Sequence, residues 1–398
     1  MVIQIIGLGY IGLPTMALIS SKNIKVHGVD INSEVVNNIN NGKIHIQEPG
    51  VEELILKAHE QKLISASLRP KPADVHVIVV PTPFKNNFEP DISYVISAAD
   101  SLKDILKEGD LIVIESTSPV GTTEKVKNFI YNERKDIGGK LNFAYCPERI
   151  LPGNALYELS KNDRAIGGID IQSSKLAKKF YQKFVDGNLY LTNSRTAELC
   201  KLTENSSRDI QIAFANELSM ICESADIDVR ELINLANKHP RVNILSPGVG
   251  VGGHCIAVDP YFIISDFPNE SKIIAMARDV NNSKTNWCIK LIKNSIENFN
   301  SNNKKKPNVS LLGLAFKPNI DDLRESPALH IAKQIIEFKY AEYYVVEPNI
   351  NSHPHFKIIE LNEAIKKSDI IVVLVGHKEF KSINITEKKI IDFTGITK

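Results

Sequence analysis

The segment Val2–Gly12 reads VIQIIGLGYIG and joins an apolar run to three closely spaced glycines. Its first five residues predict a buried strand, and Pro14–Ser20 predicts a helix just beyond the glycines. In such a unit Gly7 permits the tight turn, Gly9 lets a pyrophosphate approach the backbone, and Gly12 lets helix and strand pack closely. The free N–H groups at the start of the helix favour phosphate. The segment therefore predicts a dinucleotide-binding unit.

A carboxylate follows the next predicted strand, Ile24–Val29. Asp30 lies 18 residues after Gly12, where it can accept hydrogen bonds from a ribose diol. It would repel a 2′-phosphate, and neither Ile31 nor Asn32 supplies a compensating cation. We therefore expect NAD rather than NADP as the cofactor. A chance glycine triplet in an ordinary turn is the alternative.

Further apolar runs organise the N-terminal half. Continuous apolar strands separated by helix-like segments imply a parallel sheet that is covered on both faces. Three such strands are expected at Val75–Val80, Leu111–Ile114 and Asn142–Tyr145.

From Thr196 the pattern becomes mainly helical. Helices are expected at Thr196–Ser224, Asp228–Lys238 and Ser271–Asn298, and a polar linker is expected at Asn298–Asn308. A second, smaller α/β unit follows, with strands expected at Val309–Leu314, Tyr343–Val346 and Ile370–Leu374. The predicted fold class is α/β, with two Rossmann-like parallel-sheet domains joined by a central helical region.

Composition limits the class of protein. The 398 residues contain 48 Lys+Arg and 47 Asp+Glu, a net charge of +1, which argues against a nucleic-acid binder. The five cysteines are odd in number and form no C-x-x-C pair, so neither a disulfide framework nor a zinc ribbon is expected. No apolar stretch reaches the ~20 residues that span a bilayer. We expect a soluble cytoplasmic protein without a metal site and without nucleic-acid or membrane partners.

The densest glycine cluster is Gly248–Cys255, with the sequence GVGVGGHC. Glycine reaches backbone angles that other residues avoid, so such a loop can wrap closely around a ligand. A cysteine is by default a small apolar core residue, which fits Cys200, Cys222 and Cys288 within predicted helices. Cys255 stands on a loop, where reactive groups are often placed, and is therefore a candidate nucleophile.

Three polar residues share one face of the long helix predicted from Thr196. Lys201, Asn205 and Arg208 are spaced by four and three residues. A solvated surface would also explain Lys201 and Arg208, but asparagine in mid-helix is not a propensity choice. A thiol beside a nicotinamide permits oxidation beyond the aldehyde, because a thiohemiacetal can lose a second hydride to give a thioester.

Several ordered blocks carry a family resemblance. They are GLGYIGLP from Gly7, VPTPF at Val80–Phe84, ESTSPVGTTE at Glu115–Glu124, YCPERILPG at Tyr145–Gly153, AELCKLTENSSRD at Ala197–Asp209, HPRVNILSPGVGVGGHCIAVDP at His239–Pro260 and GLAFKPNIDDLRESP at Gly313–Pro327. Together they resemble the UDP-glucose/GDP-mannose dehydrogenase family, over nearly the whole chain.

The resemblance implies three parts. These are an NAD-binding Rossmann domain at residues 1–194, a central helical dimerisation region at 195–300 and a UDP-sugar-binding α/β domain at 301–398. It also implies a homodimer that oxidises the C6 alcohol of a UDP-sugar to a carboxylate with two NAD per sugar. Two alternatives come from other classes: a two-electron hydroxyacid dehydrogenase, which needs no thiol, and a sensor or scaffold that binds a UDP-sugar without oxidising it.

The catalytic roles that the resemblance implies are nucleophile, oxyanion stabiliser, water activator and general base. Cys255 would be the nucleophile, and Lys201 and Asn205 would stabilise the oxyanion. Asp259 with Thr117 would activate water, and Glu148 would be the general base. Lys201 is also a candidate for proton transfer and would favour the Cys255 thiolate. From the residues alone, Glu148 and Arg149 could simply pair with each other, and Asp259 could be a turn residue.

The resemblance also assigns residues to the two ligands. At the cofactor it places Gly7, Gly9, Tyr10, Ile11, Gly12, Asp30, Thr82, Thr123 and Arg324. At the UDP-sugar it places Arg149, Ile150, Lys201, Asn205, Arg208, His239, Arg241, Gly252 and Lys317. His239 and Arg241 are expected from the neighbouring subunit, although His239 before Pro240 could equally cap its helix. Arg149, Arg241 and Lys317 carry the positive charge that a diphosphate needs.

Two departures separate the chain from the UDP-glucose branch of the family. That branch has C-x-P-K-D after the nucleophile, where this chain has CIAVD at Cys255–Asp259. It has PEFL-x-E where this chain has PERILP at Pro147–Pro152, so the second carboxylate is replaced by Pro152. Both departures favour a UDP-N-acetylhexosamine. We expect UDP-N-acetylmannosamine as the substrate, with UDP-N-acetylglucosamine as the alternative.

Overall fold

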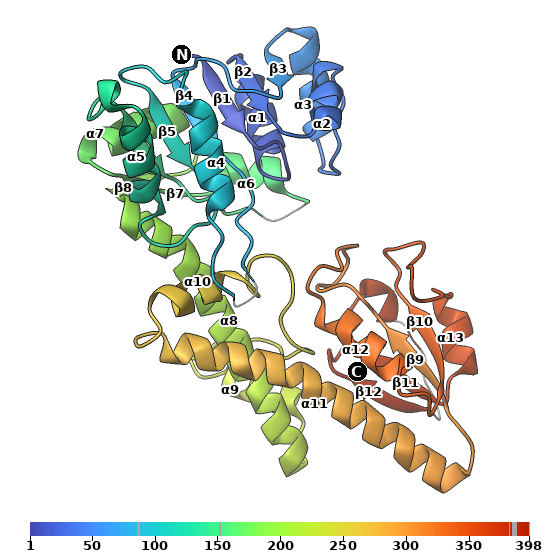
Figure 1. Cartoon of the computed structure of the whole chain (residues 1–398). Helices are drawn as coiled ribbons and strands as arrows, with labels where there is room; N and C mark the ends of the chain where they lie inside the picture. Colours follow the sequence, from blue (N-terminus) through green and yellow to red (C-terminus); the bar gives the residue numbers. More distant parts are fainter. Residues whose placement is uncertain (86–87, 151–152, 382, 384–387, 398) are drawn as a thin grey trace. The chain divides into compact units, whose positions relative to one another are not determined.

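The computed structural model describes residues 1–85, 88–150, 153–381, 383 and 388–397. Pro152, whose place in the PERILP segment was noted above, lies outside the described residues. The chain forms two compact units, Met1–Thr203 and Glu204–Lys398 (Figure 1). No helix in the described part of the chain is long and apolar enough to cross a membrane.

The first unit is built on an eight-stranded sheet with the order β3-β2-β1-β4-β5-β6-β7-β8. The strands are β1 Ile3–Ile6, β2 Val26–Val29, β3 Ile64–Ser67, β4 Val75–Ile78, β5 Leu111–Ile114, β6 Asn142–Tyr145, β7 Arg164–Gly168 and β8 Leu189–Asn193. All neighbours are parallel except β6 and β7, which pair antiparallel. The predicted parallel sheet is confirmed for β1 to β6, and the reversal at β7 was not predicted.

Helices cover both faces of this sheet (Figure 1). They are α1 Gly12–Ser21, α2 Ser33–Asn40, α3 Val51–Glu60, α4 Ser93–Leu102, α5 Thr122–Glu133, α6 Ala155–Lys161 and α7 Ile171–Tyr181, with a short 3-10 turn η1 at Lys135–Ile137. Alternate strand residues point to opposite faces. Val77 and Val113 join the apolar core beneath α1, α2, α3, α6 and α7, whereas Ile78 and Ile112 join the core beneath α4 and α5. The central strands are thus apolar on both faces because both faces are buried.

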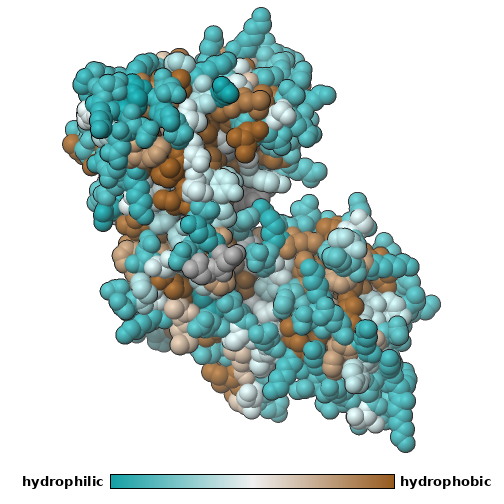
Figure 2. Space-filling model, in the orientation of Figure 1, coloured by the Kyte–Doolittle hydropathy of each residue, from teal (hydrophilic) through white to brown (hydrophobic). Residues whose placement is uncertain are grey.

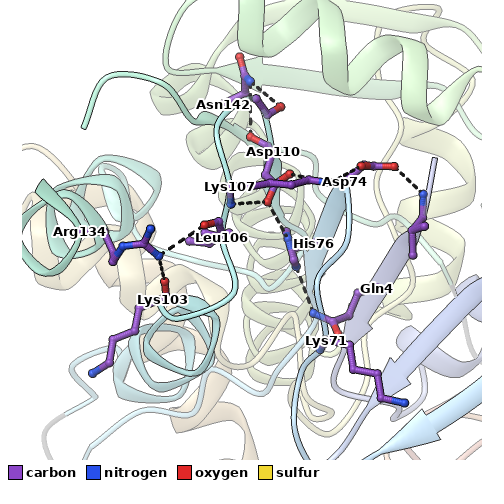
Figure 3. A network of polar contacts seen from close by, with 12 residues as sticks. Gln4, Lys71, Asp74, His76, Lys103, Leu106, Lys107, Asp110, Arg134 and Asn142 are labelled. Atoms are coloured by element: carbon purple, nitrogen blue, oxygen red, sulfur yellow. Dashed lines mark hydrogen bonds and ion pairs between the residues drawn. The ribbon is translucent and has the colours of Figure 1, made fainter. Parts of the chain in front are cut away.

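A buried polar network fastens the amino ends of the central strands (Figure 3). Gln4 Nε2 lies 3.1 Å from His76 Nδ1, and His76 Nε2 lies 3.6 Å from a carboxylate oxygen of Asp110. The backbone N–H of Lys71 donates to Gln4 at 2.7 Å, and that of Lys107 donates to Asp110 at 2.9 Å. The Gln4–His76 contact joins β1 to β4, and the approach of His76 to Asp110 extends the network to the start of β5, at the end of these strands opposite the glycine turn.

The second unit contains a helical part and a small sheet. The helix α8, Ser194–Ala225, begins in the first unit and continues into the second. It is followed by α9 Val229–Ala236, α10 Asp259–Asp266 and α11 Lys272–Asn303. The sheet has the order β10-β9-β11-β12 and is parallel throughout, with β9 Asn308–Leu312, β10 Glu342–Val346, β11 Ile370–Val373 and β12 Lys389–Asp392. The remaining elements are α12 Pro327–Ile336, α13 Leu361–Lys367 and the 3-10 turn η2 Lys378–Phe380.

The predicted linker Asn298–Asn308 is wrong over its first half, because α11 continues to Asn303. Ile292, Ile296 and Phe299 follow each other at helical spacing, and Phe299 packs against the apolar core that α11 and α12 share with the second sheet. The polar letters around Phe299 concealed this spacing in the sequence. The helix ends where Lys304 adopts the left-handed conformation, with φ of +53°.

Candidate functional site

The glycine turn after β1 has the geometry that its spacing predicts. Gly7 has φ of +94°, which favours glycine. A Cβ atom at Gly12 would lie 1.9 Å from the carbonyl oxygen of Gly7, so helix and turn are in contact there. A Cβ atom at Gly9 would meet no atom within 4 Å. Gly7 and Gly12 are therefore required by the fold, whereas Gly9 faces open space and leaves room for a phosphate.

The carboxylate of Asp30 is held beside this turn. One oxygen accepts the N–H of Leu8 at 3.0 Å and the other accepts the N–H of Asn32 at 2.9 Å. The side chain is half-buried, and the side chain of Ile11, which precedes α1, does not cap the helix. A fixed acceptor for ribose hydroxyls thus lies next to the start of a helix, whose N-terminus favours phosphate, and this combination fits NAD.

Thr123 is tied to a glutamate that the sequence analysis missed. Its hydroxyl and its N–H donate to Glu198 at 2.7 and 2.8 Å, and the N–H of Gly121 donates to the same carboxylate at 2.6 Å. Glu198 of α8 therefore closes the start of α5, and burial raises its pKa. Thr82 and Thr117, which follow β4 and β5, are half-buried. The sequence could have indicated Glu198 through its spacing, because it lies three residues before Lys201 and so on the same face of the helix.

Glu148 and Lys201 meet in the first unit. The Lys201 ammonium donates to the carbonyl oxygen of Glu148 at 2.9 Å and lies 3.4 Å from a carboxylate oxygen of the same residue. The other carboxylate oxygen accepts the N–H of Ile150 at 2.8 Å. Both side chains are buried. The ammonium is thereby fixed beside a carboxylate, in the arrangement that a base and a cationic oxyanion stabiliser require.

The alternative pairing of Glu148 with Arg149 is not what the structure shows. The Arg149 guanidinium donates to the carbonyl oxygen of Asp163 at 2.8 Å and lies 3.5 Å from the sulfur of Cys200. Cys200 is only half-buried, so a role as a small apolar core residue fits it less well than it fits the buried Cys222 and Cys288.

A buried polar network contains Glu115, Cys146, Arg164 and Tyr181. Two of its members, Glu115 and Cys146, lie two residues before Thr117 and Glu148 in the sequence. Tyr181 donates to Glu115 at 2.5 Å, and an Arg164 nitrogen lies 3.6 Å from the same carboxylate oxygen. Burial raises the pKa of Glu115 and raises the pKa of the neighbouring Cys146 thiol to about 11. Sequence reasoning missed this network because its members come from four separate segments.

In the second unit Asn205, Cys255 and Asp259 come together. The Asn205 amide donates to the Asp259 carboxylate at 2.5 Å, and the N–H of Asp259 donates to the carbonyl oxygen of Cys255 at 2.8 Å. Asp259 is buried at the start of α10, while Cys255 is exposed. The turn-residue alternative for Asp259 is therefore incomplete, because its carboxylate serves as an acceptor for α8.

Several glycines of the glycine-rich loop pack against the protein itself. A Cβ atom at Gly252 would lie 2.4 Å from the carbonyl oxygen of Glu325, and one at Gly253 would lie 2.8 Å from the Phe316 ring. Gly250 has φ of +137° and contacts Thr285. The glycines bring the loop that ends at Cys255 against the loop that follows β9.

The other predicted ligand residues of the second unit are exposed. They are Arg208, His239, Arg241, Lys317 and Arg324. Arg324 pairs with Asp322 at 2.5 Å, and His239 Nδ1 lies 3.4 Å from the N–H of Arg241, as a local turn contact would place it. The solvated-surface explanation fits the exposed Arg208 but not Lys201, which is buried. Asp209, the residue after Arg208, is buried and bonded to Arg278 at 2.7 Å.

Comparison with known proteins covers the whole chain. Models of the UDP-glucose/GDP-mannose dehydrogenase family match as the NAD binding domain at residues 1–185, the central domain at 195–283 and the UDP binding domain at 310–398. A UDP-N-acetyl-D-mannosamine dehydrogenase of Campylobacter jejuni is 48% identical over 405 residues, covering 98% of each chain. The enzyme of the same name from Escherichia coli strain K12 is 48% identical, covering 99% of this chain and 98% of its own.

A solved structure agrees with these sequence matches. A UDP-D-ManNAc dehydrogenase from Pyrococcus horikoshii superposes with a TM-score of 0.90 at 37% identity, covering 100% of this chain and 96% of its own. The structural match covers the whole chain, and the three domain models match successive parts of it. The chain belongs to the UDP-glucose/GDP-mannose dehydrogenase family, whose members are NAD-binding dehydrogenases.

Proposed function

We propose that the protein oxidises UDP-N-acetyl-D-mannosamine at C6 to UDP-N-acetyl-D-mannosaminuronate, with two NAD and one water per sugar. The choice of sugar is supported by relatives of that name at 48% identity. The four-electron course is supported by one observation above all: Cys255 is the one exposed cysteine of the five, all of which are described. It lies four residues before Asp259, the first residue of α10, and its carbonyl oxygen accepts the N–H of Asp259, whose carboxylate bonds to Asn205. A two-electron dehydrogenase would need no such thiol.

In the proposed mechanism, the turn at Gly9 and the Asp30 carboxylate would hold NAD, which would supply the hydride acceptor for both oxidations at C6. The Cys255 thiolate adds to the intermediate aldehyde, giving a thiohemiacetal that is oxidised to a thioester. Lys201 and Asn205 stabilise the oxyanion, and Lys201 is a candidate to take the first proton. Water, oriented by Asp259 and Thr117 with Glu148 as base, releases the carboxylate and restores the thiol.

We also propose the ligand-binding residues and the three domains that the sequence predicts. Tyr10, Ile11, Asp30, Thr82, Thr123 and Arg324 are assigned to the cofactor, and Arg149, Ile150, Arg208, His239, Arg241, Gly252 and Lys317 to the UDP-sugar. The division into residues 1–194, 195–300 and 301–398 resembles the matched domain ranges.

We further propose a homodimer through the central helices, with His239 and Arg241 contributed across the interface. Phe214 and Ile221 of α8 and Leu235 of α9 are exposed although apolar, and Figure 2 shows apolar residues, in brown, among polar ones on the molecular surface. Exposed apolar side chains on neighbouring helices are typical of a protein interface. A monomer in analytical ultracentrifugation at micromolar concentration would contradict this arrangement.

The substrate is tested by incubating the purified protein with NAD and either UDP-N-acetylmannosamine or UDP-N-acetylglucosamine. We expect two NADH per sugar, followed by absorbance, and a higher kcat/KM for the mannosamine epimer. One NADH per sugar would support a two-electron enzyme instead, and UDP-sugar binding without NADH would support a sensor. A higher kcat/KM for the glucosamine epimer would support the alternative substrate.

Two glycine variants separate cofactor contact from folding. Gly9→Ala should raise the KM for NAD by about 10-fold or more while thermal unfolding stays unchanged, because its Cβ meets only open space. Gly12→Ala should instead lower the free energy of unfolding by about 1–3 kcal/mol, because its Cβ would overlap the Gly7 carbonyl. A Gly9→Ala protein that binds NAD normally would show that no phosphate lies at this turn.

A further inference from the structure

The second sheet repeats the backbone arrangement that holds Asp30 in the first unit. After β1, the N–H of Gly7 donates to Val29 at 2.8 Å and the N–H of Leu8 donates to Asp30 at 3.0 Å. The acid follows β2, the strand beside β1. In that unit the half-buried carboxylate remains within reach of a ligand.

The corresponding residues after β9 make the same bonds. The N–H of Gly313 donates to Val346 at 2.8 Å, and the N–H of Leu314 donates to Glu347 at 2.7 Å. Gly313 has φ of +93°, against +94° for Gly7, and the N–H of Asn349 donates to Glu347 at 3.1 Å as that of Asn32 does to Asp30. Glu347 follows β10, the strand beside β9.

The two carboxylates differ in what covers them. Glu347 is buried, and its Oε2 atom lies 3.1 Å from Nε2 of His377, which is also buried. Burial alone would raise the pKa of Glu347, but hydrogen bonds from His377 and from the Leu314 N–H lower it to about 2. The carboxylate is therefore ionised at neutral pH and is bonded to the protein where Asp30 can bond to a ribose.

Glu347 and His377 together hold both ends of a short loop. Glu347 accepts the N–H groups of Leu314 and Ala315 at 2.7 and 3.0 Å. His377 Nδ1 accepts the N–H of Asn319 at 2.9 Å. Because a donor points at Nδ1, that nitrogen carries no hydrogen, so the ring hydrogen is on Nε2 and faces Glu347. Residues 314–319 are thus anchored at their start by the acid and at their end by the imidazole.

Lys317 lies between these two anchors, and its side chain is exposed. We infer that Glu347 and His377 are positioning residues, which hold the loop so that the Lys317 ammonium meets the diphosphate of the UDP-sugar. The inference rests on the proposed UDP-binding role of Lys317. An exposed lysine has a long, flexible side chain, so fixing its backbone reduces the entropy lost on binding.

The same loop contacts the segment that ends at Cys255. The Phe316 ring lies against Gly253, and the N–H of Gly253 donates to the carbonyl oxygen of Arg324 at 3.2 Å. Anchoring of residues 314–319 therefore also supports the surface on which the cysteine loop rests, within the second unit.

Two substitutions at His377 distinguish the roles of its two ring nitrogens. In His377→Gln the longer amide replaces Nε2 and keeps a donor for Glu347, but the acceptor for Asn319 is lost. In His377→Asn the shorter amide replaces Nδ1 and keeps that acceptor. With the full chain and UDP as the titrated ligand, calorimetry should show a Kd raised roughly 5- to 10-fold for His377→Gln and within about 2-fold of wild type for His377→Asn. The Kd for NAD, whose proposed contacts other than Arg324 come from the first unit, should not change.

A double-mutant cycle tests whether His377 acts through Lys317. Lys317→Ala should weaken UDP binding, and adding His377→Gln to it should cause little further loss. Additive losses, or an unchanged UDP affinity in His377→Gln, would overturn the inference. If UDP does not bind the wild-type chain, the proposed function of the second unit fails, and this outcome is distinct from the others.

A milder variant covers the case in which His377→Gln does not fold. Asn319 has φ of +62°, which glycine adopts readily, and its side chain accepts the N–H of Lys378 at 2.9 Å. Asn319→Gly removes this bond without disturbing buried groups. We expect a UDP Kd raised about 2- to 3-fold with unchanged thermal unfolding, whereas an unchanged Kd would contradict the inference.

Discussion

Replacing Cys255 by alanine is expected to abolish formation of the sugar uronate, lowering its rate by at least ~10³-fold. The first hydride transfer does not need the thiol, but the second oxidation proceeds from a thiohemiacetal that only a sulfur nucleophile can form. Cys255 is exposed and precedes Asp259, which is fixed by Asn205. Anion-exchange chromatography of the products measures the uronate directly. Release of carboxylate at a near-normal rate would refute the covalent mechanism.

The matched control is Cys222→Ala, which removes a buried thiol from the same chain. It should keep uronate formation close to wild type at a cost of about 1 kcal/mol in stability. Alkylation at neutral pH provides an independent check. Burial raises the pKa of Cys146 to about 11 and that of Cys288 to about 12, so iodoacetamide should modify Cys255 first.

Replacing Arg278 by methionine is expected to lower the stability of the second unit by about 3–5 kcal/mol, which is about 10 °C in its unfolding midpoint. The Arg278 guanidinium bonds to the Asp209 carboxylate at 2.7 Å, and both side chains are buried. Asn281 also donates to this carboxylate, at 2.8 Å. Without Arg278 the carboxylate is left in the interior with no cation, and α8 loses its main polar tie to α11. Calorimetric unfolding measures the change.

The double variant Asp209→Leu/Arg278→Met provides the control, because it removes the buried charge together with its partner. It should recover much of the lost stability. A double variant as unstable as the single one would show that the loss comes from packing rather than from the uncompensated carboxylate. Asn205 is one helical turn before Asp209, so recovered stability should be accompanied by recovered activity.

Local patterns predicted the cofactor unit well. The backbone turn and the carboxylate of this unit come from Val2–Gly12 and Asp30. They could be predicted because a strand, a turn, a helix and a second strand form the unit within about 30 residues. The strands at Leu111–Ile114 and Asn142–Tyr145 were placed at their observed bounds, since continuous apolar runs have few other uses.

The missed features depend on residues far apart in the chain. Glu198 meets Thr123 across 75 residues, and Glu115 meets Tyr181 across 66. Each of these carboxylates looks in sequence like an ordinary helix or strand-end residue. The linker error at Asn298–Asn308 has the same origin, because only the folded structure shows that the half-buried Phe299 packs against the core.

By itself the sequence determined the α/β class and the NAD-binding unit, and it led to the prediction of Cys255 as the nucleophile, since these depend on residue type and short spacing. Only the tertiary structure decided which partner each buried charged group meets: Lys201 meets Glu148, Asp209 meets Arg278, and Glu347 meets the His377 imidazole. The physical reason is that a charge can be buried only where an oppositely charged or hydrogen-bonding partner is brought to it, and the folded chain, not the local pattern, selects that partner.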